Sequence, residues 1–255
     1  MGVEISVVII AKNESQNIVD CIVSAKRISS DILVIDNDST DDMPNLVKSS
    51  GASYFNHEWK GYSNQKNFGN QQAKNDWIFS LDADERISEE LVIEINLIKS
   101  SLKNEVVLVN RLNHLGNKAI YFGEWNPDWQ KRLFNRKLNH WDESKVVHEE
   151  LKLNENQSTK KLKARLLHFT TPNAAHYRSK MEVYAKLHRE NLKKEGRTIP
   201  FYKGMSSALF GFIREYFLKL GFLDGKEGLQ LAILHFQYNK EKYFAQSKIN
   251  NTFDT

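Results

Sequence analysis

The chain has 255 residues, of which 40% are hydrophobic and 27% are charged. A chain of this length can bury a sizeable core, and with only 4 Pro its composition excludes a largely disordered protein. The single cysteine, Cys21, excludes an internal disulfide, and we expect it to be a buried, inert thiol on an apolar helical face. No nucleic-acid-binding motif is recognisable, so we expect no nucleic-acid partner.

The net charge of +4 is unevenly distributed along the chain. From residue 160 onward 18 Lys and Arg face 8 Asp and Glu, a balance of +10, whereas the part before residue 160 carries −6. This asymmetry predicts different partners for the two parts, and an anionic membrane surface suits the basic one. The N-terminus carries neither a basic nor an apolar region of signal-peptide type, so we expect a cytoplasmic protein.

Strands and helices alternate along the first part of the chain. Apolar runs predict strands at 5–10, 32–35, 52–55, 77–81 and 106–109. Helical patterns separate them, at 15–27, around Leu46 and Val47, at 64–74 and at 88–101. This order predicts an α/β fold with a Rossmann-like, mostly parallel sheet flanked by helices, in which ligands bind at the carboxyl ends of the strands.

The remainder of the chain is less regular and then helical. Residues 110–170 are rich in Trp, His and Arg, and from about residue 174 the pattern is helical and basic. Its most apolar segments, 205–220 and 229–244, fall short of the roughly 20 uninterrupted apolar residues that a membrane span needs, but they could lie on a membrane surface. We therefore expect a main domain over 1–170 and a helical, amphipathic C-terminal region over 171–255.

Carboxylates follow two of the predicted strands. Asp36 ends the strand 32–35, and Asp82-Ala83-Asp84 follows the strand 77–81. Mg²⁺ prefers oxygen ligands and commonly binds through one or two carboxylates together with substrate phosphates. Neither a P-loop nor a dinucleotide glycine motif is present, so we expect a metal on these aspartates, helped by the cation Lys66, to neutralise a pyrophosphate.

Several segments together resemble a known family. They cover most of the chain and comprise Ile9-Ile10-Ala11-Lys12-Asn13-Glu14, Val34-Ile35-Asp36-Asn37-Asp38-Ser39-Thr40-Asp41, Trp59-Lys60-Gly61-Tyr62-Ser63-Asn64-Gln65-Lys66-Asn67, Leu81-Asp82-Ala83-Asp84-Glu85, Arg132-Leu133-Phe134, Val147-His148-Glu149, Leu167-His168-Phe169 and Gly221-Phe222-Leu223-Asp224-Gly225. These segments resemble family 2 glycosyltransferases of the GT-A fold, and the closest look-alikes are bacterial lipopolysaccharide-core β-glucosyltransferases.

The resemblance implies an activity. A family 2 hexosyltransferase moves a sugar, here with glucose as the first candidate, from a UDP-sugar with inversion of the anomeric carbon. Mg²⁺ or Mn²⁺ would bridge the Asp-x-Asp motif and the diphosphate. The implied acceptor is a lipid-linked glycan such as the lipopolysaccharide core, which would place the enzyme peripherally at the inner face of the cytoplasmic membrane. Domain 1–170 would then bind the nucleotide sugar and carry out catalysis.

The resemblance also implies roles for particular residues. Those expected to bind the donor are Lys12, Asn13, Glu14, Asp36, Asn37, Lys66, Asp82, Ala83 and Asp84. Those expected to hold the metal are Asp82, Asp84 and His168. Glu149 is the expected general base, with Asp128 in reserve, and those expected to contact the acceptor or a phosphate are Trp125, Arg132 and His148.

Other interpretations remain open at this point. Arg132 could form a structural ion pair, and His168 could be a buried structural histidine. A sugar-phosphate nucleotidyltransferase has a similar architecture, but Ala11-Lys12-Asn13-Glu14 is a poor version of its glycine-rich loop. A glycosidase is disfavoured because Asp82 and Asp84 share one strand end. A sugar-nucleotide-binding protein of the membrane surface, without turnover, is the non-enzymatic alternative.

Overall fold

The computed structural model describes residues 2–144, 149–155, 157–197 and 199–244. The strands within these residues are β1 (Ile5–Ala11), β2 (Asp31–Asp36), β3 (Ser53–Asn56), β4 (Trp77–Asp82), β5 (Glu85–Ile87), β6 (Val106–Leu115), β7 (Lys118–Ala119), β8 (Trp129–Asn135) and β9 (Thr159–Thr171). The α-helices are α1 (Ile18–Ala25), α2 (Met43–Ser49), α3 (Tyr62–Gln72), α4 (Glu89–Ile98), α5 (Ala174–Lys194), α6 (Phe201–Ile213) and α7 (Gly225–Phe244). The short helical turns are η1 (Gly123–Trp125), η2 (Arg214–Leu218) and η3 (Gly221–Asp224).

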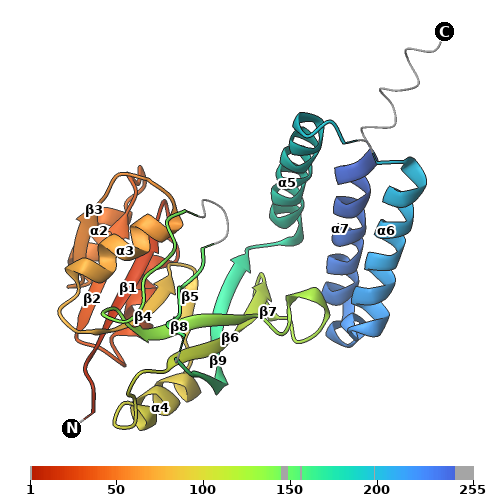
Figure 1. Ribbon diagram of the computed structural model, residues 1–255. Helices are drawn as coiled ribbons and strands as arrows, with labels where there is room; N and C mark the ends of the chain where they lie inside the picture. The colour runs from red at the N-terminus through yellow and green to blue at the C-terminus, as the bar shows by residue number, and fades with distance from the viewer. Residues whose placement is uncertain (1, 145–148, 156, 198, 245–255) are drawn as a thin grey trace. The chain divides into compact units, whose positions relative to one another are not determined.

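The nine strands of the described residues form one sheet. Its order is β3-β2-β1-β4-β8-β6-β9-β5, with β7 paired to β6. The half made of β3, β2, β1 and β4 is parallel, and β8 joins it antiparallel to β4 (Figure 1). The predicted α/β class, with helices flanking a Rossmann-like sheet, is confirmed.

The stretch 110–170 is more regular than its sequence suggested. It contains β8 and the long strand β9, which pairs antiparallel with β5. Lys and Arg occupy much of β9, at Lys161, Lys163 and Arg165, with buried Leu162 and Leu166 between and beside them. This strand is buried mainly on one face, so its apolar signal is weaker than that of the fully buried β1 or β2.

The chain divides into two compact units. The first comprises 1–111 and 128–168, and the second comprises 112–127 and 169–255. The predicted boundary at residue 170 lies next to the break between 168 and 169, but 112–127 group with the C-terminal helices. In the second unit α6 and α7 lie side by side (Figure 1). Gly204 and Gly211 of α6 face α7, since a Cβ on either would come within 3.0 Å of Tyr243 or Asn239.

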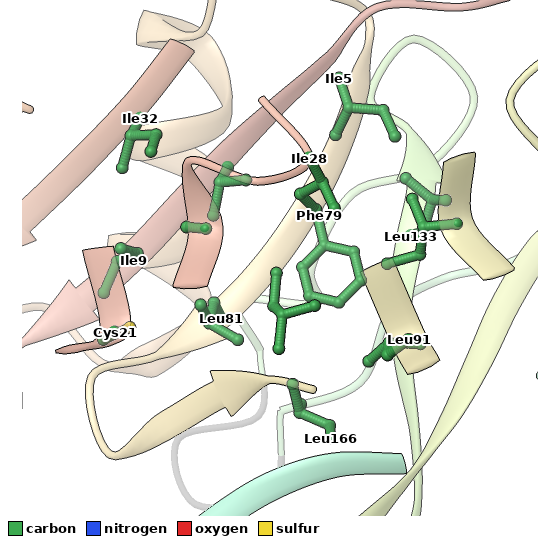
Figure 2. Packing of buried hydrophobic residues seen from close by; sticks show 14 of the residues in the cluster. Ile5, Ile9, Cys21, Ile28, Ile32, Phe79, Leu81, Leu91, Leu133 and Leu166 are labelled. Carbon is green, nitrogen blue, oxygen red and sulfur yellow. The ribbon is translucent and has the colours of Figure 1, made fainter. Parts of the chain in front are cut away.

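The core of the first unit lies between the sheet and its helices. Phe79 of β4 lies among Ile28, Leu91 and Leu133 in this cluster, and all of them are buried (Figure 2). Cys21 of α1 is fully buried in the same cluster, and burial raises the pKa of its thiol well above the ordinary value. The expectation of a buried, unreactive cysteine agrees with this setting.

The strand register brings the predicted strand-end acids to one edge of the sheet. Ala11 at the end of β1 pairs with Asp36 of β2, and Ile10 pairs with Asp82 of β4. Because β1 lies between β2 and β4, the two aspartates are two strand spacings apart, about 10 Å. On one face α3 packs closely, since a Cβ at Gly69 would collide with Val8 and Ile35.

No helix within the described residues is both long and apolar enough to cross a membrane.

Candidate functional site

The carboxyl end of β4 carries an aspartate that is tied to two cations. One carboxylate oxygen of Asp82, Oδ2, accepts a hydrogen bond from Arg132 at 2.7 Å, and the other, Oδ1, lies 3.4 Å from the Lys66 ammonium. Burial alone would raise the pKa of Asp82, but the charges of Arg132 and Lys66 outweigh it and hold that pKa well below its ordinary value. Asp82 is therefore a carboxylate at neutral pH.

A tight turn joins β4 to β5 and places a second buried acid behind Asp82. The backbone N–H of Asp82 donates to Glu85 Oε2 at 3.0 Å, and Glu85 has no exposed surface. Glu85 Oε1 pairs with Arg132 and lies 3.5 Å from Arg111. Glu85 and Arg111 have no place among the predicted site residues. The available signal was an acid three residues after a strand-end aspartate, the spacing at which a side chain reaches back to a free backbone N–H.

Arg132 is buried beneath the predicted metal motif. Only 2% of Arg132 is exposed, and its guanidinium is shared between Asp82 and Glu85. Burial opposes its charge, but these two carboxylates raise the pKa of Arg132 above its ordinary value. In this structure Arg132 therefore orients Asp82, and the role predicted for it toward acceptor or phosphate stays a prediction.

Lys66 of α3 connects the metal motif to the predicted base. Its ammonium donates to Glu149 Oε1 at 2.7 Å and lies 3.4 Å from Asp82 Oδ1, although Lys66 is only 1% exposed. The same ammonium lies 4.7 Å from the centre of the Trp141 ring, a cation–π contact. Among the described residues, Oε2 of Glu149 is buried and has no hydrogen-bond partner.

The reserve base has a different setting. Asp128 Oδ2 accepts a hydrogen bond from Arg111 Nε at 2.7 Å, and its Oδ1 accepts one from Gln130 at 2.6 Å. Both carboxylate oxygens of Asp128 therefore accept hydrogen bonds, whereas Oε2 of Glu149 accepts none from the described residues. His148 lies outside the described residues.

Asp84 and His168 form the pair that suits a divalent cation. His168 Nε2 lies 3.3 Å from Asp84 Oδ2, and β9 brings His168 there by pairing it with Glu85. A carboxylate oxygen and an imidazole nitrogen this close together could bind one divalent cation, and carboxylate is the ligand type that Mg²⁺ and Mn²⁺ prefer. The described residues contain no cluster of three or more protein ligands, so phosphate and water oxygens would have to complete the coordination.

The loops after β1 and β2 are joined by hydrogen bonds, and we call the surface that they form together the wall. Asn13, with φ of 54°, accepts the Thr40 N–H on its side-chain oxygen at 2.8 Å, and its own N–H donates to Ser39 Oγ. Asp36 accepts hydrogen bonds from Ser39 and from the Tyr54 hydroxyl, and it is completely buried. Asp36 thus holds the wall in place from behind, and the donor contact predicted for it stays a prediction.

Three of the remaining predicted residues lie on or beside these loops, whereas Ala83 is buried in the turn between β4 and β5 and Trp125 lies elsewhere. Glu14 is half-buried, and burial raises the pKa of its carboxyl above the ordinary value. Lys12 is exposed directly after β1, and Asn37 is half-buried directly after β2. Trp125 belongs to the second unit, where its indole N–H donates to the Tyr177 hydroxyl at 3.4 Å. The first unit therefore holds the described candidates for donor, metal and base.

A family model matches much of the chain. The model described as "Glycosyl transferase family 2" matches residues 6–152, which include every element of this site up to Glu149.

Curated relatives are similar over nearly the whole chain. The "Uncharacterized glycosyltransferase RP128" of Rickettsia prowazekii is 28% identical over 243 residues, covering 91% of this chain and 82% of the relative. The "Lipopolysaccharide core biosynthesis glycosyltransferase LpsC" of Rhizobium meliloti is 29% identical over 247 residues, covering 90% and 89%.

The fold also occurs among solved structures. The crystal structure of S. aureus TarS 1–349 in complex with UDP superposes with a TM-score of 0.51 at 13% identity, covering 98% of this chain and 91% of that one. At this identity the likeness concerns the fold.

Proposed function

Because the chain belongs to glycosyl transferase family 2 and has the GT-A fold, we propose that it transfers a hexose, with glucose as the first candidate, from a UDP-sugar with inversion. The grouping of Asp82, Asp84, Lys66 and Glu149 at the carboxyl end of β4 carries this proposal. An inverting transfer needs a stabilised leaving diphosphate and a separate base for the acceptor hydroxyl. Family membership favours this reaction over the nucleotidyltransferase and non-catalytic alternatives.

The donor would bind along the wall formed by the loops after β1 and β2. Asn13, Glu14 and Asn37 would line the nucleoside pocket, and Asp36 would keep the wall rigid through Ser39. Lys12 is exposed at the same edge and could approach the diphosphate. The structural neighbour TarS was crystallised with UDP, which supports a uridine donor for this chain.

Asp84 and His168 would hold Mg²⁺ or Mn²⁺, and Asp82, the third ligand predicted from the sequence, is paired with Arg132 and Lys66 in this structure. When bound, the ion neutralises the charge that develops on the diphosphate as it leaves. Asp82, restrained by Arg132, would keep the Asp82-Ala83-Asp84 turn in place so that Asp84 faces the ligand. The orientation of this turn depends on Glu85. Its carboxylate pairs with the Arg132 guanidinium and accepts a hydrogen bond from the backbone N–H of Asp82.

Lys66 would have two successive roles. Without donor, its ammonium is shared by Asp82 and Glu149. A diphosphate bound beside Asp82 would compete for this ammonium, because phosphate oxygens are strong acceptors for a lysine point charge. Glu149 would then lose its cationic partner, which makes it a better acceptor for the hydroxyl proton.

Glu149 is the proposed general base. Its buried oxygen without a hydrogen-bond partner could accept the proton as the acceptor oxygen attacks the anomeric carbon. The neighbouring His148, together with Trp125 and Arg132, is retained as a predicted acceptor contact. Asp128 stays in reserve, since its two oxygens would first have to leave Arg111 and Gln130.

The proposed acceptor is a lipid-linked saccharide such as the lipopolysaccharide core. The Rhizobium meliloti relative is named as a lipopolysaccharide core biosynthesis glycosyltransferase, which supports this acceptor class. A lipid-linked acceptor would place the enzyme at the inner face of the cytoplasmic membrane, as a peripheral protein.

A donor panel tests the proposal. UDP-glucose, UDP-galactose, UDP-N-acetylglucosamine and GDP-mannose are each incubated with Mg²⁺, with Mn²⁺ and with EDTA, and release of nucleoside diphosphate is measured. We expect one UDP-sugar to react and EDTA to stop the reaction. Asp84→Ala should lower the rate by about two orders of magnitude or more.

The matched control is Asp76→Ala, because Asp76 lies beside the opposite end of β4 in an exposed pair with Lys137. This variant should keep its activity. Preference for GDP-mannose, or full activity of Asp84→Ala in EDTA, would contradict the assignment of donor and metal.

A further inference from the structure

The second unit exposes a run of large apolar side chains. Six large apolar residues of α6, η2 and η3 are each 43% to 66% exposed, namely Leu209, Phe210, Phe217, Leu218, Phe222 and Leu223. We call these six residues the 209–223 surface. Single exposed apolar residues are common on proteins, but this many within fifteen positions form a patch of the kind that marks an interaction site.

The helix geometry explains why these side chains stay uncovered. Gly204 and Gly211 of α6 face α7, as the close approach of Tyr243 and Asn239 shows. At about 100° per residue, Leu209 and Phe210 point away from that face. The apolar side of α6 is thus broader than its contact with α7, and within the described residues no other element buries its outer side.

The accessible charge beside this surface is mainly positive. Lys203 is exposed, and the side chains of Lys219 and Lys226 are 40% and 84% exposed. The acids within the same segment are turned inward: Glu215 is 2% exposed and binds His235, while Asp224 is 5% exposed and accepts the N–H groups of Tyr121 and Phe122.

Two further acids lie near the surface and do not reverse its charge. Glu124 pairs with both Arg214 and Lys219, at 2.8 and 3.0 Å, so one carboxylate is shared by two cations. Lys226 has only a loose pair, 3.7 Å from Glu227. Exposed Phe and Leu bordered by Lys and Arg are complementary to a lipid interface with anionic headgroups, where the rings enter the acyl boundary and the cations meet the phosphates.

We propose that the 209–223 surface docks on an anionic phospholipid bilayer. The binding would be reversible and interfacial, with α6 lying along the membrane plane. This inference concerns membrane binding and does not depend on which donor or acceptor the enzyme uses. Its test therefore measures binding without turnover, and its failure would leave the proposed transferase reaction intact.

The test is flotation of the full chain with vesicles. We expect the protein to float with vesicles of phosphatidylcholine mixed with phosphatidylglycerol and to bind vesicles of phosphatidylcholine alone much more weakly. The double variant Phe210→Ser, Leu218→Ser should bind these anionic vesicles roughly tenfold or more weakly than the wild type, because two large exposed side chains no longer enter the lipid. Lys203→Gln with Lys226→Gln should weaken only the anionic-vesicle binding.

A matched control comes from α4 of the first unit. Ile93→Ser with Leu97→Ser removes side chains that are 61% and 72% exposed, and this variant should bind vesicles like the wild type. Circular dichroism and thermal unfolding check that each variant is folded. Absence of flotation by the wild type, or equal loss in the control, would overturn the proposal. So would a wild-type dimer in light scattering that Phe210→Ser, Leu218→Ser converts to monomer, since a second copy would then occupy the surface.

Discussion

Lys66 is the residue whose position has the most consequences for the site. It is almost completely buried, yet its ammonium touches carboxylates from two distant parts of the chain, Asp82 and Glu149. Burial of one ammonium is tolerable because two anions and the Trp141 ring surround it. An unpaired buried ammonium would cost free energy, so Lys66 should stay bound to some anion. If a donor diphosphate takes Lys66, Glu149 loses this partner, and donor binding should therefore be coupled to the ability of Glu149 to accept a proton.

The first prediction concerns Glu149. Glu149→Gln keeps the shape of the side chain but removes its basicity, so transfer should fall by about 10²- to 10⁴-fold while UDP binding is retained. Initial rates with the preferred donor, together with calorimetric titration of UDP, measure the two effects separately.

Glu150→Gln is the control for this change, because Glu150 is the neighbouring, exposed acid. It should leave the rate within a few-fold of the wild type. If Glu149→Gln were fully active and Asp128→Asn inactive, the base would be Asp128.

At the scale of elements, the turn from β4 to β5 decides the orientation of the metal motif. Asp82 ends β4 and Glu85 begins β5, and one backbone hydrogen bond plus Arg132 join the two residues. Burial raises the pKa of Glu85 above its ordinary value, against the opposing charge of Arg132. Burying an acid between two arginines costs free energy, because all three charges lose their water. Removing only one of the partners costs more, because it leaves a buried charge uncompensated.

The second prediction therefore concerns Glu85. Glu85→Gln leaves Arg132 and Arg111 buried with less compensating charge, so the free energy of unfolding should fall by about 3 kcal/mol. Urea-induced unfolding measures this change. Glu89→Gln, which removes an exposed partner of Arg27, should change the same free energy by less than about 1 kcal/mol. Equal effects of the two variants would mean that the buried network is not stabilising.

At the scale of the whole molecule, each unit has its own buried polar system. In the second unit the Tyr177 hydroxyl lies 2.8 Å from His235 Nε2, and His235 Nδ1 lies 2.6 Å from Glu215. Burial, together with the charge of Glu215, raises the pKa of Tyr177 to about 12. The hydroxyl is thus neutral throughout the physiological range.

The third prediction follows from the sign of this shift. The folded-state pKa of Tyr177 is raised above the unfolded value of about 10, so its contribution to stability is complete below pH 10 and is lost as the pH rises toward about 12. The loss should be on the order of 2 kcal/mol, and Tyr177→Phe should flatten this alkaline decline. Urea unfolding at several pH values from neutral to alkaline measures it, and an identical slope in both proteins would contradict the assignment.

Much of the fold follows from local patterns. The buried runs of β1, β2 and β4 are continuous and apolar, which is what a parallel central strand requires, so these strands were predictable. The strands β8 and β9 were not, because their outer faces are polar and their pairing partners are distant in sequence. The grouping of 112–127 with the C-terminal helices depends on long-range packing, which no local pattern encodes.

For the site, the sequence by itself determined which acids end which strands, because the run of apolar residues stops at the end of each strand. Asp36 and Asp82–Asp84 could therefore be assigned to one edge of the sheet, and the register places Asp36 and Asp82 there, with Asp84 in the turn that follows β4. The tertiary structure alone decided the partners of these acids. Arg132, Glu149 and His168 approach the β4 end from distant segments, and a buried charge selects its counter-ion through three-dimensional packing rather than through sequence spacing.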